Sequence, residues 1–392
     1  MDTSRRSFLV TAAAASRVQG ANDRVRLGVI GTGGRGKHLI RMARAAGGCE
    51  IAAVCDAWDV RAEEGAAETV RQFGGAAPAK YGDYRKLLER KDIDAVIVAT
   101  LDHWHSRMTV DALRAGKDVF VEKPMTSLPE QGHEIVRAVR ETKRLVQVGV
   151  QQRSIDHFIE AKKRFFDSGR IGRVHLVRTY WNANSGYLAP VPPGMETRPP
   201  GLDWDAVLGW LPKRPWNPKM YFNRFAWWDF STGGQTGGLF VHLVDVVHWY
   251  LGLKRPASAV ALGGIYQYDD GRDTPDNINL ILDYPERVNV TFEATITDLN
   301  VRESVDIVFL GSEGRLHIFR YGYRFLPKEG EPVVQKGGPE PAHMANFLDC
   351  VRTRKEPNAN AVDGHYSAMA CHIGNIAYRE GRRVEWDPRW DV

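Results

Sequence analysis

The feature that most constrains the fold is a glycine-rich turn near the start of the chain, Gly31-Thr-Gly-Gly-Arg-Gly36, which follows a short apolar run and precedes a helix-forming stretch. This order predicts a strand, a tight turn and the start of a helix. In such a turn the first glycine permits the bend, the second lets the backbone approach a pyrophosphate, and the third allows close packing of helix on strand. Gly31, Gly33 and Gly36 occupy these positions, so the helix N-terminus is predicted to face the phosphates of a dinucleotide.

An acidic residue, Asp56, ends a second apolar run at residues 51–56. It lies about 20 residues beyond the last glycine, the distance at which a carboxylate binds the ribose 2′-hydroxyl of NAD. No arginine directly follows Asp56, which favours NAD over NADP, whereas Arg61 is the residue that argues for NADP. The alternative is a surface turn followed by a strand that happens to end in Asp. Strand, spacing and acid together favour dinucleotide binding.

The alternation of strands and helices continues to residue 150. Helices are predicted at residues 61–73, 81–91, 108–115 and 129–142, and further strands at residues 93–100, 118–122 and 144–149. The run at 93–100 is continuous and β-branched, as in a buried parallel sheet. Residues 22–150 are therefore predicted to form an α/β domain of the Rossmann type, a doubly wound parallel sheet that binds a dinucleotide.

The pattern changes after residue 150. Residues 190–218 combine many prolines with Trp204, Trp210 and Trp216, which excludes regular structure and indicates a binding wall or a subunit arm. We predict helices at residues 155–168, 239–251, 343–352 and 364–380, and strands at residues 174–181, 258–268, 277–284, 288–297, 305–310 and 315–319. Short strands separated by turns indicate an antiparallel sheet, so residues 151–392 are predicted to form an α+β domain for substrate binding and oligomerisation.

The composition excludes several classes of function. The chain has 392 residues, 43% of them hydrophobic, which is enough for two domains. Its net charge of +5 is spread without a Lys/Arg run, and no zinc-finger or RNA-recognition motif is present, so no nucleic-acid partner is expected. The four cysteines form no Cys-x-x-Cys pair and are interpreted as packing thiols. No apolar run is long enough for a membrane span, so no membrane anchor is expected.

The first 21 residues resemble a twin-arginine export signal. Ser4-Arg-Arg-Ser-Phe-Leu9 precedes a weakly apolar run at residues 10–15. This pattern predicts export of the folded protein to the periplasm, with the signal removed. The alternative is a disordered, alanine-rich leader with a chance arginine pair, in which case the protein is cytoplasmic.

Three motifs together resemble the Gfo/Idh/MocA oxidoreductase family: the glycine turn, Glu122-Lys-Pro124 at a strand end, and His242-Leu-Val-Asp245 on a predicted helix. The likeness extends from about Val25 to Pro388. It implies that the C-terminal domain contains a large, open, mostly antiparallel sheet. It also implies that NAD exchanges hydride with a sugar, sugar derivative or cyclitol bound between the domains.

Lys123 is the first predicted catalytic residue. It follows a parallel strand at the sheet edge where doubly wound sheets bind ligands, and a desolvated lysine has a pKa suited to accepting a hydroxyl proton. A surface lysine paired with Glu122 is the alternative. The resemblance implies that His242 is the acid/base at the substrate alcohol, with Asp245 as its orienter or a substrate ligand; a core histidine satisfied by a carboxylate is the alternative. Many family members carry an Asp four residues before this histidine, where this chain has Gly238.

The remaining predicted site residues lie in the same motifs, in a strand-end loop at residues 100–105, and in residues 151–153. The cofactor is predicted to contact Gly31, Thr32, Gly33, Gly34, Arg35, Gly36, Asp56, Thr100, His103, His105, Glu122, Lys123 and Gln151, and the substrate Lys123, His105, Gln152, Arg153, Asp245 and His242. A polar interdomain hinge is the alternative for residues 151–153. No metal is expected, because His103 and His105 lack an accompanying His-Glu-x-x-His or paired-cysteine motif.

The predicted activity is that of an NAD-dependent oxidoreductase acting on a secondary alcohol of a sugar-like substrate. A redox-neutral glycoside hydrolase or lyase is the first alternative, because soluble NAD is not expected to be recycled outside the cytoplasm. Such an enzyme oxidises a sugar hydroxyl transiently with bound NAD and then returns the hydride. A non-catalytic NAD-binding sensor or structural protein is the second alternative. Export also favours a tightly bound cofactor, and the face of the C-terminal sheet is the expected contact of a homo-oligomer.

Overall fold

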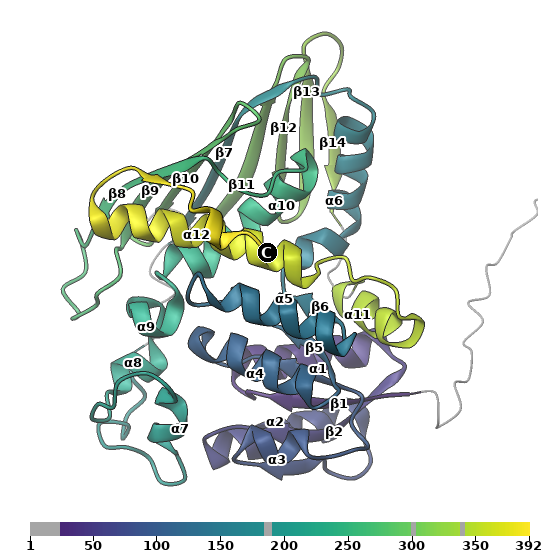
Figure 1. Ribbon diagram of the computed structural model, residues 1–392, viewed down its shortest axis with the longest axis vertical. Helices are drawn as coiled ribbons and strands as arrows, with labels where there is room; N and C mark the ends of the chain where they lie inside the picture. Colours follow the sequence, from purple (N-terminus) through teal and green to yellow (C-terminus); the bar gives the residue numbers. More distant parts are fainter. Residues whose placement is uncertain (1–23, 184–189, 299–302, 338–341) are drawn as a thin grey trace, which may run out of the picture.

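The computed structural model describes residues 24–183, 190–298, 303–337 and 342–392. Its N-terminal part is a six-stranded parallel sheet in the order β3-β2-β1-β4-β5-β6 (Figure 1). The strands are β1 (Val25–Ile30), β2 (Cys49–Cys55), β3 (Ala79–Tyr81), β4 (Ala95–Val98), β5 (Asp118–Val121) and β6 (Val146–Val148). The helices between them are α1 (Gly34–Ala46), α2 (Asp59–Phe73), α3 (Tyr84–Leu88), α4 (Asp102–Arg114) and α5 (Gln131–Thr142). The predicted doubly wound sheet is confirmed, and its order reverses between β1 and β4, where such sheets bind ligands.

Two local features of this sheet differ from the sequence prediction. Strand β3 escapes prediction because its three residues carry no buried apolar position. Residues 100–105 are predicted as a loop, but α4 begins at Asp102 and includes His103 and His105. Asp102 favours this helix start, because a carboxylate in the first turn is stabilised by the positive end of the helix dipole.

The C-terminal part contains a nine-stranded sheet in the order β14-β13-β12-β11-β7-β10-β9-β8-β15. Its strands are β7 (Val174–Ala183), β8 (Ser258–Gly264), β9 (Asn277–Tyr284), β10 (Val288–Thr295), β11 (Glu303–Gly311), β12 (Gly314–Phe319), β13 (Gly322–Pro327), β14 (Val333–Lys336) and β15 (Val384–Glu385). All neighbours are antiparallel except β7 and β10. The predicted, mostly antiparallel sheet is confirmed, and β13, β14 and β15 extend it beyond the predicted strands.

One face of this sheet is covered by helices α10 (Val241–Leu251) and α12 (Ala361–Glu380) (Figure 1). Along β10, Val290 and Phe292 are buried in the core, whereas Asn289 and Glu293 are exposed on the other face. This alternation is typical of an antiparallel sheet with one uncovered face.

Two predicted helices contain π-helical turns. Residues 155–168 form α6 (Asp156–Ala161) followed by η3 (Lys162–Asp167), and η5 (Thr236–Phe240) leads into α10. The predicted helix at residues 343–352 is α11 (Ala342–Thr353), which returns to the N-terminal sheet and packs Met344, Phe347 and Leu348 into a core with β1. The C-terminal chain therefore contributes to the N-terminal core.

Residues 190–231, which we call the tryptophan-rich arm, lie beside the N-terminal sheet (Figure 1). The arm contains α7 (Trp204–Leu208), α8 (Pro218–Phe222) and α9 (Trp228–Ser231). The prediction that residues 190–218 lack regular structure is wrong at α7, because the Asp203 carboxylate accepts a hydrogen bond from the Ala206 amide and caps that helix. Trp204 is buried with Trp58 and Phe230 in a small apolar core.

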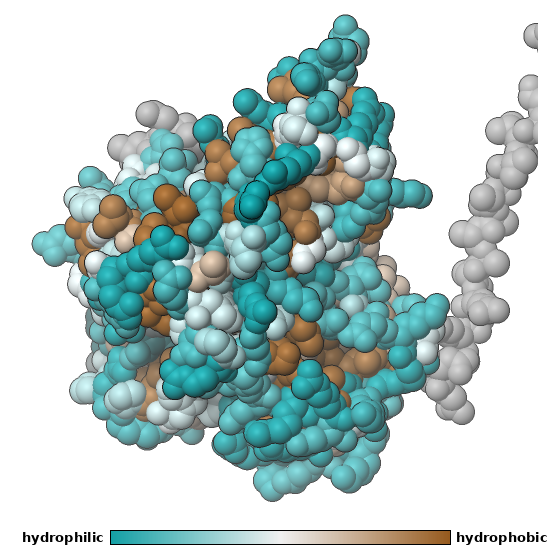
Figure 2. Space-filling model, turned by 45° about the horizontal axis from the view of Figure 1, so that its top comes forward, coloured by the Kyte–Doolittle hydropathy of each residue, from teal (hydrophilic) through white to brown (hydrophobic). Residues whose placement is uncertain are grey.

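All four cysteines are buried and free, as expected for packing thiols. In the part of the chain that the structure describes, no helix is long and apolar enough to cross a membrane. The face drawn in Figure 2 is mostly hydrophilic, with apolar patches between the hydrophilic residues. The predicted export signal at residues 1–21 lies outside the described residues.

Candidate active site

The glycine turn between β1 and α1 is shaped by its backbone. Gly31 has a φ of +87°, and a Cβ there would lie 2.5 Å from the Ala99 carbonyl oxygen. A Cβ at Gly36 would overlap the Gly31 carbonyl group, so both positions require glycine. No atom lies within 4 Å of the Cβ positions of Gly33 and Gly34, so this side of the turn is open at the start of α1. Such a cradle fits the pyrophosphate of a dinucleotide.

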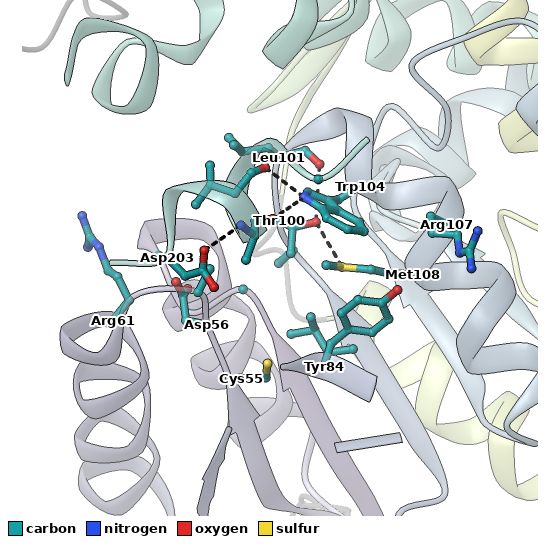
Figure 3. Close-up of a pocket in the computed structure, with 18 of the residues that line it drawn as sticks. Cys55, Asp56, Arg61, Tyr84, Thr100, Leu101, Trp104, Arg107, Met108 and Asp203 are labelled. Carbon is teal, nitrogen blue, oxygen red and sulfur yellow. Dashed lines mark hydrogen bonds between the residues drawn. The ribbon is translucent and has the colours of Figure 1, made fainter. Parts of the chain in front are cut away.

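A cleft of about 1240 Å³ runs along the carboxyl ends of the N-terminal strands (Figure 3). One wall belongs to the Rossmann sheet and includes Gly31, Gly33, Gly34, Arg35, Asp56, Thr100 and Leu101. The other belongs to the tryptophan-rich arm and includes Gly201, Asp203, Val207, Trp210, Tyr221 and Arg224. Pockets for single small molecules are usually smaller, so the volume suits a dinucleotide. The predicted irregular segment therefore lines a cleft, and its roles as a binding wall or a subunit arm stay predictions.

Hydrogen bonds hold the arm across the cleft. Beyond the end of β2, the Asp59 amide donates to the Gly201 carbonyl at 3.1 Å. At the start of α4, the indole Nε1 of Trp104 donates to the Val207 carbonyl at 3.0 Å (Figure 3). These bonds fix the arm to two different strand ends, so the arm forms one side of the cleft.

His103 also helps to hold the tryptophan-rich arm in place. Its Nε2 lies 2.9 Å from the Val207 carbonyl oxygen, and its own carbonyl accepts a hydrogen bond from Trp210 Nε1 at 2.8 Å. Burial lowers the pKa of His103 to about 4, so the ring is neutral. His103 thus holds the arm and is not among the residues that line the cleft, and its predicted contact with the cofactor stays a prediction.

Asp56 lines the cleft directly after β2, near Arg61 (Figure 3). Its carboxylate accepts hydrogen bonds from the amides of Thr32 at 2.8 Å and Trp58 at 3.1 Å. Burial raises the pKa of Asp56 above its ordinary value, whereas these hydrogen bonds and Arg61 lower it. A carboxylate fixed here retains lone pairs for a ribose hydroxyl. The Thr32 hydroxyl donates to the Arg61 carbonyl at 2.7 Å and so supports the turn.

Glu122 directly follows β5 and is buried, with an exposed fraction of 4%. Arg35 reaches it from the glycine turn, and its Nε donates to Glu122 Oε1 at 2.6 Å. Burial acts to raise the pKa of Glu122, but Arg35 and Lys123 hold it below its ordinary value. Glu122 is therefore ionised, and its ion pair with Arg35 holds that arginine in the wall of the cleft.

Lys123 is half-buried beside this ion pair, and its Nζ donates to the Gly238 carbonyl oxygen at 2.6 Å. Burial lowers the pKa of Lys123 to about 8 against the attraction of Glu122, and the nearby Arg224 guanidinium also lowers it. The alternative of a surface lysine paired with Glu122 is excluded, because Glu122 pairs with Arg35. An amine with this pKa exchanges its proton near neutral pH, as a hydroxyl-activating base requires.

His242 lies on α10 and lines a separate small cavity of about 50 Å³, together with Gln151, Gln152 and Trp181. Its Nδ1 is 3.3 Å from the Gln152 Oε1. The two side chains are within hydrogen-bond distance, and a neutral imidazole ring has one donor and one acceptor nitrogen. Burial lowers the pKa of His242 well below its ordinary value, and the charge of Lys123 adds to the effect. The ring is therefore neutral.

Asp245 does not orient His242. Its carboxylate accepts hydrogen bonds from Arg153 Nε at 2.8 Å and from the Ser367 hydroxyl at 2.9 Å. Arg153 is itself buried and also pairs with Asp363 at 3.0 Å. Neither Arg153 nor Asp245 lines the cleft or the small cavity. Arg153 and Asp245 form a buried ion pair, and Arg153 also joins it to α12 through Asp363. Their predicted substrate roles stay predictions.

His105 is also placed differently from the prediction. Because α4 begins at Asp102, the His105 ring is buried, and its Nδ1 lies 2.7 Å from the Pro124 carbonyl oxygen. It does not line the cleft and instead supports the backbone after Lys123. Among the described residues, no group of three or more His, Cys, Asp or Glu side chains is placed to hold a metal ion.

Two family models match this chain. One, described as an oxidoreductase family NAD-binding Rossmann fold, matches residues 25–150. The other, described as an oxidoreductase family C-terminal alpha/beta domain, matches residues 191–391. The chain belongs to the Gfo/Idh/MocA oxidoreductase family. The resemblance carried by the glycine turn, Glu122-Lys-Pro124 and His242-Leu-Val-Asp245 is thereby confirmed.

Relatives within the Gfo/Idh/MocA family include inositol 2-dehydrogenase 2 of Saccharopolyspora erythraea, which is 34% identical over 187 residues, 47% of this chain and 53% of the relative. A glycosyl hydrolase family 109 protein of the same organism is 38% identical over 128 residues, 32% of this chain and 28% of the relative. The chain thus spans about half or less of the length of these relatives. Levoglucosan dehydrogenase in complex with NADH and levoglucosan shares the fold, with a TM-score of 0.71 at 17% identity over 92% of this chain and 99% of that one.

The site departs from the family resemblance at Gly238, where an Asp is expected. A Cβ at Gly238 would overlap the Phe225 ring, so an aspartate has no room. The Arg224 guanidinium lies over the same ring, 4.5 Å from its centroid. The structure therefore replaces the expected carboxylate with an aromatic ring and brings a cation next to it.

The sequence analysis misses two residues of the site, Asp102 and Arg224. Asp102 is almost completely buried, and its carboxylate accepts hydrogen bonds from Arg224 Nη1 at 2.8 Å and from the Thr232 hydroxyl at 3.1 Å. Asp102 could have been identified from the sequence, because it lies in the strand-end segment 100–105 that already contains predicted site residues. Arg224 could not, because its partner is 122 positions away in the sequence.

Proposed function

We propose that this chain is an NAD-dependent oxidoreductase that transfers hydride between the nicotinamide and a secondary alcohol of a sugar, sugar derivative or cyclitol. The observation that carries the proposal is Lys123, a half-buried amine with a lowered pKa that directly follows β5. It lies next to Glu122, whose partner Arg35 lines the dinucleotide cleft. Sugar and cyclitol dehydrogenases among the relatives support this substrate class.

In this proposal each part of the site has one task. The open backbone at Gly33 and Gly34 and the carboxylate of Asp56 bind NAD, which when bound supplies the hydride chemistry. Lys123 accepts the hydroxyl proton as the alcohol is oxidised and returns it in the reverse direction. The neutral His242, whose pKa the nearby Lys123 lowers, hydrogen-bonds the hydroxyl and orients it. The tryptophan-rich arm limits access of water to the cleft.

Cofactor titrations and substrate panels test the proposal. We expect purified protein to bind NADH more tightly than NADPH, because Asp56 repels a 2′-phosphate. We also expect oxidation of at least one polyol, aldose or inositol with formation of one NADH per product. NADH binding without turnover on any such compound would favour a non-catalytic sensor or structural protein instead.

A redox-neutral glycoside hydrolase or lyase is the second candidate. It is favoured by the attachment of the arm to two strand ends, because an enclosed cofactor that stays bound can return its hydride within each cycle. The similarity to a glycosyl hydrolase family 109 protein supports it as well. The test is product analysis on a glycoside panel without added NAD, together with the absorbance of the purified protein in the reduced-nicotinamide band. Cleavage without NADH accumulation would favour this candidate, whereas turnover stoichiometric with added NAD would exclude it.

Export, domain limits and assembly are part of the same proposal. We propose that residues 1–21 direct export by the twin-arginine route, and that residues 22–150 and 151–392 are the two domains. Fractionation of cells expressing the chain and a variant with both Arg5 and Arg6 changed to lysine tests export.

The uncovered face of the nine-stranded sheet exposes Val260, Leu262 and Ile281, which supports a homo-oligomer through this face. Light scattering of wild-type protein and Leu262→Glu tests it, and a monomeric wild type would contradict it.

A further inference from the structure

Arg224 presents one edge of its guanidinium without a protein partner. Its Nη1 donates to the buried Asp102 carboxylate at 2.8 Å, and its plane is held over the Phe225 ring. Among the described residues, no acceptor contacts its Nε or Nη2. The side chain lines the cleft and is 31% exposed. The Nε–Nη2 edge is the one that binds a carboxylate through two parallel hydrogen bonds.

The charges around Arg224 favour an anionic ligand. Arg35 is paired with Glu122, and Arg224 is paired with Asp102. Lys123 donates instead to a neutral carbonyl oxygen. These three cations and two anions leave one positive charge while Lys123 is protonated. An anion at the free edge of Arg224 is therefore attracted by this cluster while Lys123 is protonated, although carboxylates such as Asp56 and Asp203 line other parts of the cleft.

We propose that the substrate of this enzyme is a sugar acid, an aldonate or a uronate, whose carboxylate is bound by the Nε–Nη2 edge of Arg224. This inference rests on the proposed oxidoreductase function and names its substrate class. Arg224 is a specificity-determining residue, and Asp102 and Phe225 hold it in place. The hydroxyl group to be oxidised then lies between the bound carboxylate and Lys123.

The alternative ligand for Arg224 is a phosphate of the cofactor. Two observations favour the substrate. Asp102 holds Arg224 at the start of α4, which follows β4, whereas the phosphate cradle follows β1. Arg224 also lies close enough to Lys123 to lower the pKa of that amine. Arg224 is therefore near the proposed proton acceptor and after a different strand from the phosphate cradle.

The test is calorimetric binding of sugars to full-length protein saturated with NADH. D-gluconate and D-glucuronate are compared with D-glucose and myo-inositol as neutral probes. We expect at least one acid to bind about 10- to 100-fold more tightly than the neutral probes, as a charge-assisted bidentate contact provides. Arg224→Gln should remove this preference. Arg224→Lys keeps a cation for Asp102 but lacks the bidentate edge, so it should also lose most of the preference while remaining folded.

Arg214→Gln is the matched control. Arg214 lies on the same arm, pairs with a single carboxylate, Asp229, at 2.6 Å, and is similarly exposed, but it does not line the cleft. We expect it to leave the acid preference unchanged, and we expect none of the three variants to change the Kd of NADH. The inference is overturned if no acid binds more tightly than the neutral probes, or if Arg224→Gln weakens acids and neutral probes equally. A weaker NADH Kd in Arg224→Gln would assign Arg224 to the cofactor. Failure of the proposed function is a separate result, because it appears as absence of NADH binding or of turnover in the wild type.

Discussion

Two parts of the site lie along the same edge of one parallel sheet but are built differently. The phosphate cradle is the glycine turn at residues 31–36, and the proton-transfer pocket is the group formed by Lys123, Asp102 and Arg224. The cradle consists of consecutive residues, and its shape depends on backbone dihedral angles and on the space beside Gly33 and Gly34. The pocket consists of contacts between distant segments. Lys123 bonds the carbonyl of a residue 115 positions away, and Asp102 bonds Arg224 at a separation of 122.

This difference determines which of the two parts of the site can change its residues without changing the backbone. A side chain at Gly31 or Gly36 overlaps backbone atoms, so the cradle cannot change without disturbing the turn. In the pocket, side chains can be exchanged while the backbone stays in place. The Phe225 ring beside Gly238, where the family resemblance implies an aspartate, is such an exchange. We infer that dinucleotide binding depends on backbone geometry and that substrate choice is open to side-chain substitution.

The largest effect is expected for Lys123→Met. Removal of the proton acceptor should lower kcat by about 10²- to 10⁴-fold, the usual contribution of a general base. NADH binding should change little, because the cradle does not include this side chain. Steady-state rates and NADH titration measure both quantities.

Lys117→Met is the control for Lys123→Met. Lys117 is also buried next to β5 and donates to two backbone carbonyls, but it lies at the amino end of the strand. We expect it to lower stability without changing kcat per folded molecule. A comparable loss of kcat in both variants would mean that Lys123 acts through the fold and not in proton transfer.

The second largest effect is expected in the cradle, where two glycines should behave differently. Gly36→Ala places a methyl group on the Gly31 carbonyl, and we expect it to lower the free energy of unfolding by about 3 kcal/mol. Gly33→Ala meets no protein atom and should leave the melting temperature unchanged. It should weaken NADH binding by about tenfold, or about 1.4 kcal/mol, because the methyl group occupies space needed by the pyrophosphate. Equal losses of stability in both variants would contradict the role assigned to Gly33.

The same contrast explains what the sequence can predict. The cradle and Asp56 could be predicted because their roles are set by local order and spacing. Lys123 and His242 could be predicted because each belongs to a short motif. The roles of His105, Arg153 and Asp245 could not, since they depend on which helix faces meet, and spacing along one helix does not determine its neighbours.

The fold shows the same limit. The strands β9 and β10 could be predicted because their buried and exposed residues alternate regularly. The edge strand β14 has no buried residue, so its sequence carries no such pattern. Its pairing with β13 depends on a neighbour already in the sheet. Sequence patterns therefore predict elements that bury a face and miss those defined by pairing alone.

A smaller effect is expected when the family aspartate is restored. Gly238→Asp forces the new side chain against the Phe225 ring, and we expect a loss of about 2 kcal/mol in unfolding free energy. In the background of Phe225→Ala the same substitution should cost less, because the ring is absent. Chemical denaturation of the four proteins in this cycle measures the coupling between the two positions. Additive losses would show that Phe225 does not occupy the space of the aspartate.

The smallest effect is expected for Asp56→Ala. Loss of the carboxylate removes a ribose contact and the repulsion of a 2′-phosphate, so the preference for NADH over NADPH should fall by about tenfold, about 1.4 kcal/mol. Arg61 remains in the cleft and can then pair with the 2′-phosphate of NADPH. Competition between the two reduced cofactors measures the change, and an unchanged ratio would remove Asp56 from cofactor selection.

The measurement that tests the account most directly is the pH dependence of kcat/KM for alcohol oxidation, compared between wild type and Lys123→Met. Burial lowers the pKa of Lys123 to about 8, so the neutral amine is scarce below this pH and predominates above it. We predict a rate that rises through an apparent pKa of about 8 and levels off above it. We also predict that this rise is absent from the residual activity of Lys123→Met. The same rise in Lys123→Met, or a wild-type rise centred near the ordinary lysine value of about 10.4, would contradict Lys123 as the proton acceptor.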